Sequence, residues 1–170
     1  TRWNCDWSSD VCSSDLVEFG EKEYKEIDSF CLNENIDWFV SVWDHSSVDF
    51  MKAFNPMAVK IPSDKLNDVE FLKKTKELNC PIILSSGGSI ESIIDEAIST
   101  VGSENNVLMQ CTSIYPCEIN QLDLAVISSF RDKYNIVPGF SCHQTSPVFG
   151  SFAVSHGARI VEQHFTLNRA

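Results

Sequence analysis

The sequence has 170 residues, a length that fits a single domain with a sizeable core. Its net charge of −11 at pH 7 excludes nucleic acids and anionic membrane surfaces as expected partners, because both are polyanions. The longest apolar runs are only as long as strands, so no membrane span is predicted. The seven cysteines form no CxxC pair, which favours reduced thiols in a cytoplasmic protein over a disulfide framework.

Residues 1–16 differ in pattern from the rest of the chain. They repeat the triplet Ser-Ser-Asp, carry no helical or strand periodicity, and lack the basic and apolar layout of a signal peptide. They resemble translated adapter sequence, and we predict a leader that is non-native or disordered. The alternative is a native but unstructured N-terminus, and the folded domain is expected over 17–170.

From Gly20 onward, helical and strand-like patterns alternate. In chain order we expect a helix over 20–35, a strand over 37–43, a helix over 48–54, a strand over 58–61, a helix over 67–78, a strand over 81–84, a helix over 89–101, a strand over 107–111, a helix over 122–134, a strand over 136–140, a helix over 148–156 and a strand over 159–165. Asn67 and Ser89 are expected to cap the helices that follow them, and Gly102 is placed to end the second.

The strict alternation of about six strands with helices predicts an α/β fold with parallel strands and right-handed crossovers. Two architectures fit this pattern: an open doubly wound sheet, and a partial TIM (β/α)8 barrel, of which a complete example needs roughly 250 residues. No strand is followed by GxGxxG or a P-loop, which weakens the nucleotide-binding version of the open sheet.

Polar residues follow the predicted strands, where both architectures place their functional sites. The pairs are Ser41 with Asp44, Lys60 with Ser63, Ser85 with Ser86, Ser113 with Tyr115, Ser141 with His143, and Glu162 with His164. Lys60 lies inside an apolar strand, so it needs a polar partner: a phosphate, a Schiff-base carbonyl or a structural counter-ion. The run Ser85-Ser-Gly-Gly88 before a helix suits an anion, with a plain N-cap turn as the alternative.

Three residues at strand ends indicate a metal-assisted site. Glu162 and His164 are two residues apart, so their side chains leave the same face of a strand. His143 ends the preceding strand and would bring a second imidazole beside them; the alternative is that each histidine satisfies a buried hydrogen bond. Of the other two histidines, His45 either lines the site or makes a loop hydrogen bond, and His156 is expected to cap a helix.

Five motifs occur in order along this part of the chain. They are Lys60-Ile-Pro-Ser63, Ile83-Leu-Ser-Ser-Gly87, Cys111-Thr-Ser-Ile-Tyr115-Pro116, Gly139-Phe-Ser-Cys-His143 and Glu162-Gln-His-Phe-Thr166. In order and spacing they resemble the sialic acid synthase family, which comprises N-acetylneuraminate synthases and their legionaminic and pseudaminic acid relatives. The resemblance covers nearly everything from about Trp38 to Ala170. It implies a homodimeric TIM-barrel transferase of sialic acid biosynthesis, usually with a C-terminal antifreeze-like domain.

The resemblance also implies a reaction and its residues. Phosphoenolpyruvate condenses with an N-acylated amino sugar, such as N-acetylmannosamine, to form a nonulosonic acid and release phosphate. The positions of His143 and His164 match ligands of a divalent metal, typically manganese, with magnesium as the alternative. The matches to phosphoenolpyruvate contacts are Lys60, Ser63, Ser85, Ser113 and Ser141, with Ser41 in the position of a family threonine. Tyr115 and Glu162 resemble groups that face the sugar, and the catalytic roles fall to Glu162 and Lys60.

Several features depart from the family pattern. Cys142 stands where Asp or Gly is usual, and Asp64-Lys65 replaces a small residue and an acid. We expect 17–170 to be an incomplete synthase barrel, without the family's first two βα units and without the antifreeze-like domain, and to be inactive alone. Two alternatives remain open: a Schiff-base aldolase that uses Lys60, and an inactive barrel remnant that binds sugars.

Overall fold

The computed structural model describes residues 19–167, and the chain divides into two compact units, Thr1–Trp38 and Phe39–Ala170. The predicted leader over 1–16 lies outside the described residues. Among residues 19–167, no helix combines the length and apolar character needed to cross a membrane.

The described part of the first unit is one helix and its flanking aromatic residues. Helix α1 (Glu21–Glu34) ends at Asn35, whose φ of 54° is left-handed, as the predicted boundary requires. The ring of Tyr24 packs between Phe19 and Trp38, with centroid distances of 6.5 and 5.9 Å. No residue of α1 is buried, so the described residues of this unit meet through ring contacts and polar contacts at the surface.

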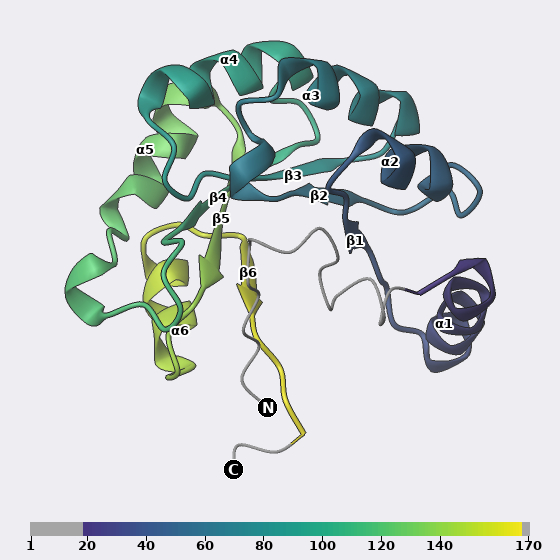
Figure 1. Ribbon diagram of the computed structural model, residues 1–170. Coiled ribbons are helices and arrows are strands. Elements are labelled where there is room, and N and C mark those ends of the chain that lie inside the picture. Colours follow the sequence, from purple (N-terminus) through teal and green to yellow (C-terminus); the bar gives the residue numbers. More distant parts are fainter. Residues whose placement is uncertain (1–18, 168–170) are drawn as a thin grey trace, which may run out of the picture. The chain divides into compact units, whose positions relative to one another are not determined.

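The second unit is built on one six-stranded parallel sheet (Figure 1). Its strands follow chain order from edge to edge: β1 (Val40–Ser41), β2 (Val59–Ile61), β3 (Ile82–Ser85), β4 (Val107–Cys111), β5 (Val137–Cys142) and β6 (Ile160–Gln163). Every neighbouring pair is parallel, as the alternation of elements predicts. A strict sequential order is typical of a barrel and differs from the reversed order of a doubly wound sheet.

One contact demonstrates that this sheet curls. Lys60 on β2 and Glu162 on β6 lie four strand spacings apart in the sheet order, yet Lys60 Nζ is 3.0 Å from Glu162 Oε1. In a flat sheet these spacings would separate the two backbones by about 19 Å, which is more than the two side chains span. The strands therefore curve around a common interior, and the predicted partial barrel is confirmed.

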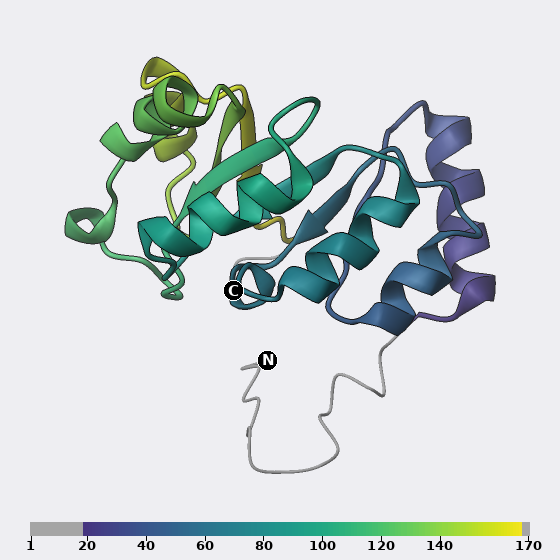
Figure 2. The same cartoon turned by 90° about the horizontal axis from the view of Figure 1, so that it is seen from above.

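Helices cover the outer side of the curled sheet (Figure 1; Figure 2). They are α2 (His45–Met51), α3 (Val69–Thr75), α4 (Glu91–Val101), α5 (Ala125–Tyr134) and α6 (Val148–Ser155), with short 3-10 turns η2 (Ser63–Lys65), η3 (Lys76–Leu78) and η4 (Ile119–Gln121). Helix α3 packs against both α2 and α4, α5 packs against β4 and β5, and α6 packs against β5 and β6.

The two faces of β5 have different surroundings. Phe140 and Cys142 are buried in an apolar cluster with Ile127 of α5 and Ala153 of α6. Gly139 faces the barrel interior, where an added Cβ would lie 3.0 Å from Met109 Cγ. Alternate residues of one strand therefore belong to the helix layer and to the interior, as the period of two requires.

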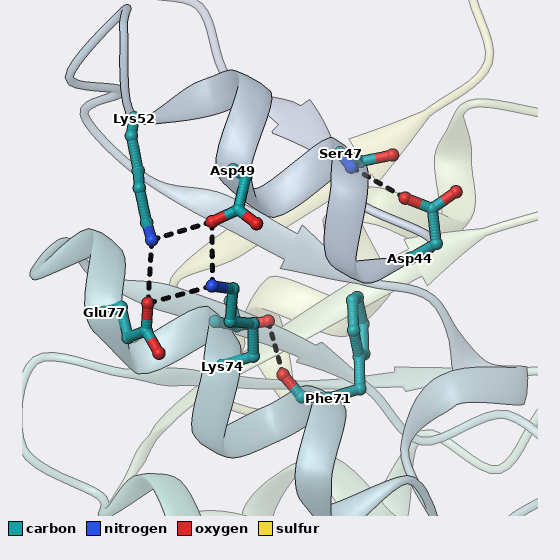
Figure 3. A network of polar contacts seen from close by, with 8 residues as sticks. Asp44, Ser47, Asp49, Lys52, Phe71, Lys74 and Glu77 are labelled. Atoms are coloured by element: carbon teal, nitrogen blue, oxygen red, sulfur yellow. Dashed lines mark hydrogen bonds and ion pairs between the residues drawn. The ribbon is translucent and has the colours of Figure 1, made fainter.

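A ring of ion pairs joins the end of α2 to α3 and the 3-10 turn η3 that follows it (Figure 3). Lys52 contacts Asp49 at 2.8 Å and Glu77 at 2.7 Å, and Lys74 contacts the same two carboxylates at 2.8 and 3.1 Å. Hydrogen bonds from Lys52 and then Lys74 lower the pKa of Asp49 to about 2. Because these groups face water, the ring is expected to orient the helices rather than to supply much stability.

Two of the predicted helix caps are wrong. The cap of α3 is Asp68 rather than Asn67, and its Oδ1 accepts from Phe71 N at 3.0 Å. The cap position of α4 is Ile90 rather than Ser89, because Ser89 N donates to Ser86 O and still belongs to the preceding turn. Gly102 does end α4, as predicted.

Several predicted boundaries are also wrong. The strand expected over 159–165 is only Ile160–Gln163, so His164 follows the strand instead of sharing a strand face with Glu162. The strand expected over 37–43 is only Val40–Ser41, and the helix expected over 48–54 is His45–Met51. That helix begins early because Asp44 Oδ1 accepts from Ser47 N at 2.7 Å (Figure 3). The helix expected over 122–134 begins at Ala125, since the 3-10 turn η4 and an extended Leu122 precede it.

Candidate active site

The barrel interior has an apolar layer followed by a polar one. Ala58, Ile83, Val107, Met109 and Ile160 pack together inside the curled sheet. Moving two residues along a strand keeps the side chain on the same face and brings it closer to the carboxyl end. Two positions after Ala58, Ile83, Met109 and Ile160, and after the inward-facing Gly139, the residues are Lys60, Ser85, Cys111, Glu162 and Ser141. These five residues form the polar layer.

Three members of the polar layer are bonded to one another. Glu162 Oε1 accepts hydrogen bonds from Lys60 Nζ at 3.0 Å and from Ser141 Oγ at 3.2 Å. The Lys60 side chain is 14% exposed and that of Glu162 is 36% exposed. The counter-ion that Lys60 needs inside an apolar strand is therefore Glu162, on the far side of the interior.

A small cradle forms where Gly87 follows β3. Gly87 N donates to Ser63 Oγ at 3.0 Å, and Ser63 Oγ lies 3.2 Å from Cys111 Sγ. A Cβ added to Gly87 would lie 2.7 Å from Cys111 Sγ and 2.8 Å from Ser63 Oγ, and it would also collide with Ser113 Oγ. Three polar side chains therefore converge on the space that the missing side chain of Gly87 leaves open.

Ser85 contributes a hydroxyl without a partner among the described residues. It is 2% exposed, its Oγ makes no hydrogen bond there, and it shares the inward face with Ile83. A buried hydroxyl that lacks a partner carries a free-energy penalty, which a bound ligand or water relieves. The polar layer thus has unused hydrogen-bonding capacity.

Three aromatic residues cluster at the carboxyl ends of β4, β5 and β6. The ring centroids of Tyr115 and His143 are 4.1 Å apart, and those of His143 and His164 are 5.6 Å apart. Tyr115 also meets His164 edge to face at 5.9 Å. The two histidines that the strand-end pattern singled out therefore lie side by side, with Tyr115 against both.

His143 is held in one orientation by the backbone. Its Nδ1 lies 2.6 Å from Thr112 O, and since a carbonyl only accepts, Nδ1 carries the hydrogen. Burial lowers the pKa of His143, and the bond to Thr112 O opposes that shift only in part. The ring is therefore neutral at pH 7, and Nε2 carries an unprotonated lone pair.

The charges of the site also act on Tyr115. Although Tyr115 is 66% exposed, partial desolvation of its hydroxyl raises the pKa, and the negative charge of Glu162 raises it further. The hydroxyl stays protonated at neutral pH and is available as a hydrogen-bond donor.

These residues fit a metal ion in part. A neutral imidazole oriented through Nδ1 by a carbonyl is the usual form of a histidine ligand, and His143 meets this description. His164 lies beside it, whereas residues 19–167 contain no group of three His, Cys, Asp or Glu side chains arranged to hold a metal. The described chain thus offers two ligands, and water or substrate oxygens would complete the coordination.

Ser41, His45 and His156 lie away from the centre of the polar layer. Ser41 pairs in register with Lys60, at the exposed edge strand. His45 opens α2 and stacks on Phe71 with a centroid distance of 5.9 Å, rather than making the loop contact expected. His156 caps α6 as predicted, with Nδ1 2.9 Å from Phe152 O.

Sequence reasoning included Gly87 in the candidate anion run Ser85–Gly88 but missed Cys111 as a site residue. The position of Cys111 two residues after Met109 indicates the inward face, and this signal could have found it. The departure at Cys142, by contrast, lies on the outward face and is 2% exposed among apolar side chains. That departure therefore does not reach the polar layer.

An open hollow of about 750 Å³ lies next to the aromatic cluster. It is lined by Pro116, Cys117, Glu118, Ile119, Asn120, Gln144 and Thr145, which follow β4 and β5. Cys117 N donates to His143 O at 3.1 Å, so one lining residue of the hollow is hydrogen-bonded to the backbone of the histidine. The hollow has both apolar and amide side chains in its lining.

Comparisons with known proteins agree with this geometry. The model of the NeuB family matches residues 5–170. The chain is 33% identical over 160 residues to N-acetylneuraminate-9-phosphate synthase of Drosophila melanogaster, covering 92% of this chain and 43% of that protein. It is 33% identical over 162 residues to pseudaminic acid synthase of Campylobacter jejuni subsp. jejuni, covering 92% of this chain and 47% of that protein.

A solved structure gives the same result for the fold. N-acetylneuraminic acid (sialic acid) synthetase from Leptospira borgpetersenii serovar Hardjo-bovis, in complex with citrate, matches with a TM-score of 0.87 and 27% identity. The match covers 91% of this chain and 55% of that one. The chain spans less than half the length of the two curated relatives.

Proposed function

Because this chain belongs to the NeuB family, we propose that it carries the substrate-binding core of an enzyme that makes nonulosonic acids from phosphoenolpyruvate and an N-acylated amino sugar. The condensation itself is proposed for the whole protein, because this chain covers only 43% and 47% of the two relatives. The observation that carries the proposal is the polar layer, whose lysine, serines and carboxylate face the interior beside two paired histidines.

The anionic substrate is assigned to the polar layer and the cradle. Lys60 supplies positive charge, and hydroxyl groups of Ser41, Ser63, Ser85, Ser113 and Ser141 supply hydrogen bonds to the phosphate and carboxylate oxygens. The unpartnered Ser85 hydroxyl and the converging groups around Gly87 support this assignment. An anion there would also satisfy buried polar groups that otherwise lack partners.

The sugar is assigned to the aromatic cluster and the adjoining hollow. Tyr115 donates a hydrogen bond from its protonated hydroxyl, and the Glu162 carboxylate accepts one from the sugar. His143 and His164 would hold a divalent metal, manganese or magnesium, which when bound polarises the aldehyde of the open-chain sugar. The free Nε2 of His143 supports this role.

The proposed chemistry balances as follows. Carbon 3 of phosphoenolpyruvate attacks the aldehyde carbon, a new C–C bond forms, and the aldehyde oxygen becomes a hydroxyl. Water adds at carbon 2, and the resulting intermediate breaks its C–O bond to release inorganic phosphate. Lys60 and the serines stabilise the negative charge of the phosphate throughout, which is the electrostatic part of the catalysis.

The wider assignments follow from the family. A homodimer is proposed for the whole protein, by the same resemblance. The described cysteines are all free thiols, which supports a reducing, cytoplasmic location. Small molecules are the proposed partners.

Metal binding by the two histidines is tested on the chain itself. We expect the variants His143→Ala and His164→Ala each to weaken Mn²⁺ binding at least about tenfold, measured as free Mn²⁺ by electron paramagnetic resonance. His156→Ala is the matched control, because His156 is exposed at the end of α6 and should leave binding unchanged. Equal Mn²⁺ affinity in all four proteins would refute the assignment of the metal.

A further inference from the structure

Glu162 occupies the donors that an anionic substrate would need. Its Oε1 accepts from Lys60 Nζ at 3.0 Å and from Ser141 Oγ at 3.2 Å. Lys60 is the single cation among the five residues of the polar layer, and Ser141 is one of the hydroxyl groups assigned to the anion. An anion that binds Lys60 must therefore either displace the Glu162 carboxylate or lie next to it.

The burial of the two partners decides which of them moves. The Lys60 side chain is 14% exposed and lies on an interior strand, whereas the Glu162 side chain is 36% exposed and lies on β6. Glu162 has room to turn toward the solvent, while Lys60 is held by its surroundings. Leaving Lys60 unpaired in the empty site would be costly, so the pair is expected whenever no anion is bound.

We propose that Glu162 is an internal substitute for the substrate anion, held by Lys60 and Ser141 until a phosphorylated carboxylate replaces it. This inference rests on the proposed function of the site. The displaced carboxylate remains near the carboxyl end of β6, two residues before His164, so it becomes free where the second substrate is assigned. Binding of the anion and exposure of the Glu162 carboxylate are thus one exchange of ion-pair partners.

The exchange has a consequence for ligand selection. A ligand with a single weak charge gains little when it displaces a carboxylate from an ammonium group, because one ion pair replaces another. A ligand with several charges, such as phosphoenolpyruvate, also engages the hydroxyl groups around Gly87 and gains more. The pair therefore favours multiply charged anions over single carboxylates such as pyruvate.

The test compares anion binding by the full chain and its variants, in the presence of a chelator so that no metal contributes. Isothermal titration calorimetry with phosphoenolpyruvate should show that Glu162→Gln binds about tenfold more tightly than the unmodified chain, which corresponds to about 1.4 kcal/mol. The reason is that the amide has no negative charge to repel the anion and binds Lys60 more weakly than a carboxylate does, while its size is nearly the same. Glu162→Ala should show a similar gain.

Glu104→Gln is the matched control. Glu104 is exposed and precedes β4, at the opposite ends of the strands, and the substitution removes the same charge. We expect its affinity for phosphoenolpyruvate to stay within twofold of the unmodified chain. Pyruvate should gain at least as much as phosphoenolpyruvate in Glu162→Gln, because the discrimination described above is removed.

The outcomes separate the inference from the function beneath it. If the unmodified chain binds phosphoenolpyruvate and both Glu162 variants bind it equally or more weakly, Glu162 positions Lys60 rather than competing for it, and the inference is wrong while the anion site stands. If phosphoenolpyruvate binds to none of the folded proteins, the anion site and the inference fail together. A gain of the same size in Glu104→Gln would assign the effect to net charge and would also refute the inference.

Discussion

The substitution Gly87→Ala tests whether the cradle binds the anion. The new Cβ would lie 2.7 Å from Cys111 Sγ and 2.8 Å from Ser63 Oγ, and would also collide with Ser113 Oγ. Distances below 3.0 Å force the neighbours to move, and two of the three neighbours, Ser63 and Ser113, are hydroxyl groups assigned to the anion. Overpacking of this kind typically costs about 1–3 kcal/mol of unfolding free energy.

Gly88→Ala provides a control with a different physical cause. Gly88 has a φ of +69°, and a Cβ there would meet nothing within 4 Å. An alanine at this position is strained only by its left-handed backbone, which costs about 1–2 kcal/mol. Both variants should therefore lose a similar amount of stability, although only one of them fills the cradle.

The assay measures stability and binding on the same proteins. Urea unfolding followed by circular dichroism gives the change in unfolding free energy, and calorimetry gives the affinity for phosphoenolpyruvate. We expect Gly87→Ala to weaken binding at least tenfold and Gly88→Ala to leave it within about twofold of the unmodified chain. Unchanged binding in Gly87→Ala would refute the role of the cradle, and equal losses in both variants would show that stability alone controls binding.

Two further predictions concern the helices. Asp68→Ala should destabilise the chain by about 1 kcal/mol in urea unfolding, because it removes the cap of α3. Asn67→Ala should have almost no effect. A larger loss of stability in Asn67→Ala than in Asp68→Ala would show that Asn67 is the cap after all. The lowered pKa of Asp49 stabilises the folded state above the pKa of the unfolded chain, and this contribution is lost as pH falls from about 4 to 2. The unmodified chain should therefore lose stability as pH falls through this range, and Asp49→Asn should be less sensitive to pH there. Identical acid titrations of the two proteins would show that the contacts of Asp49 with Lys52 and Lys74 do not contribute to folding stability.

The sequence was sufficient for features that depend on strand periodicity. The polar residues at the carboxyl ends of strands, Lys60, Ser141 and Glu162 among them, could be assigned to one site because side chains of parallel strands repeat every two residues on the same face. The proximity of His143 and His164 has a related cause, since each directly follows the last residue of one of two adjacent parallel strands. The partial barrel was likewise predictable from the alternation of elements.

Features that depend on three-dimensional convergence were not predictable in this way. Asn67 and Asp68 are both good caps, and only the path of the preceding turn decides between them. Gly87 and Cys111 belong to different strand ends, and neither residue type indicates a ligand until Ser63 and Ser113 are seen to meet them. The partner of Lys60 was open for the same reason, because Glu162 is 102 residues away in the chain.

The alternating surroundings of β5 separate two kinds of evolutionary constraint within a few residues. A change at Phe140 or Cys142 alters the fit with α5 and α6, and a second substitution in those helices can restore that fit. A change at Ser141 would alter the proposed contact with a small molecule, which does not evolve in response. Lineages of this chain can therefore exchange outward-facing residues in compensating pairs, while the inward-facing residues persist for as long as the substrate remains the same.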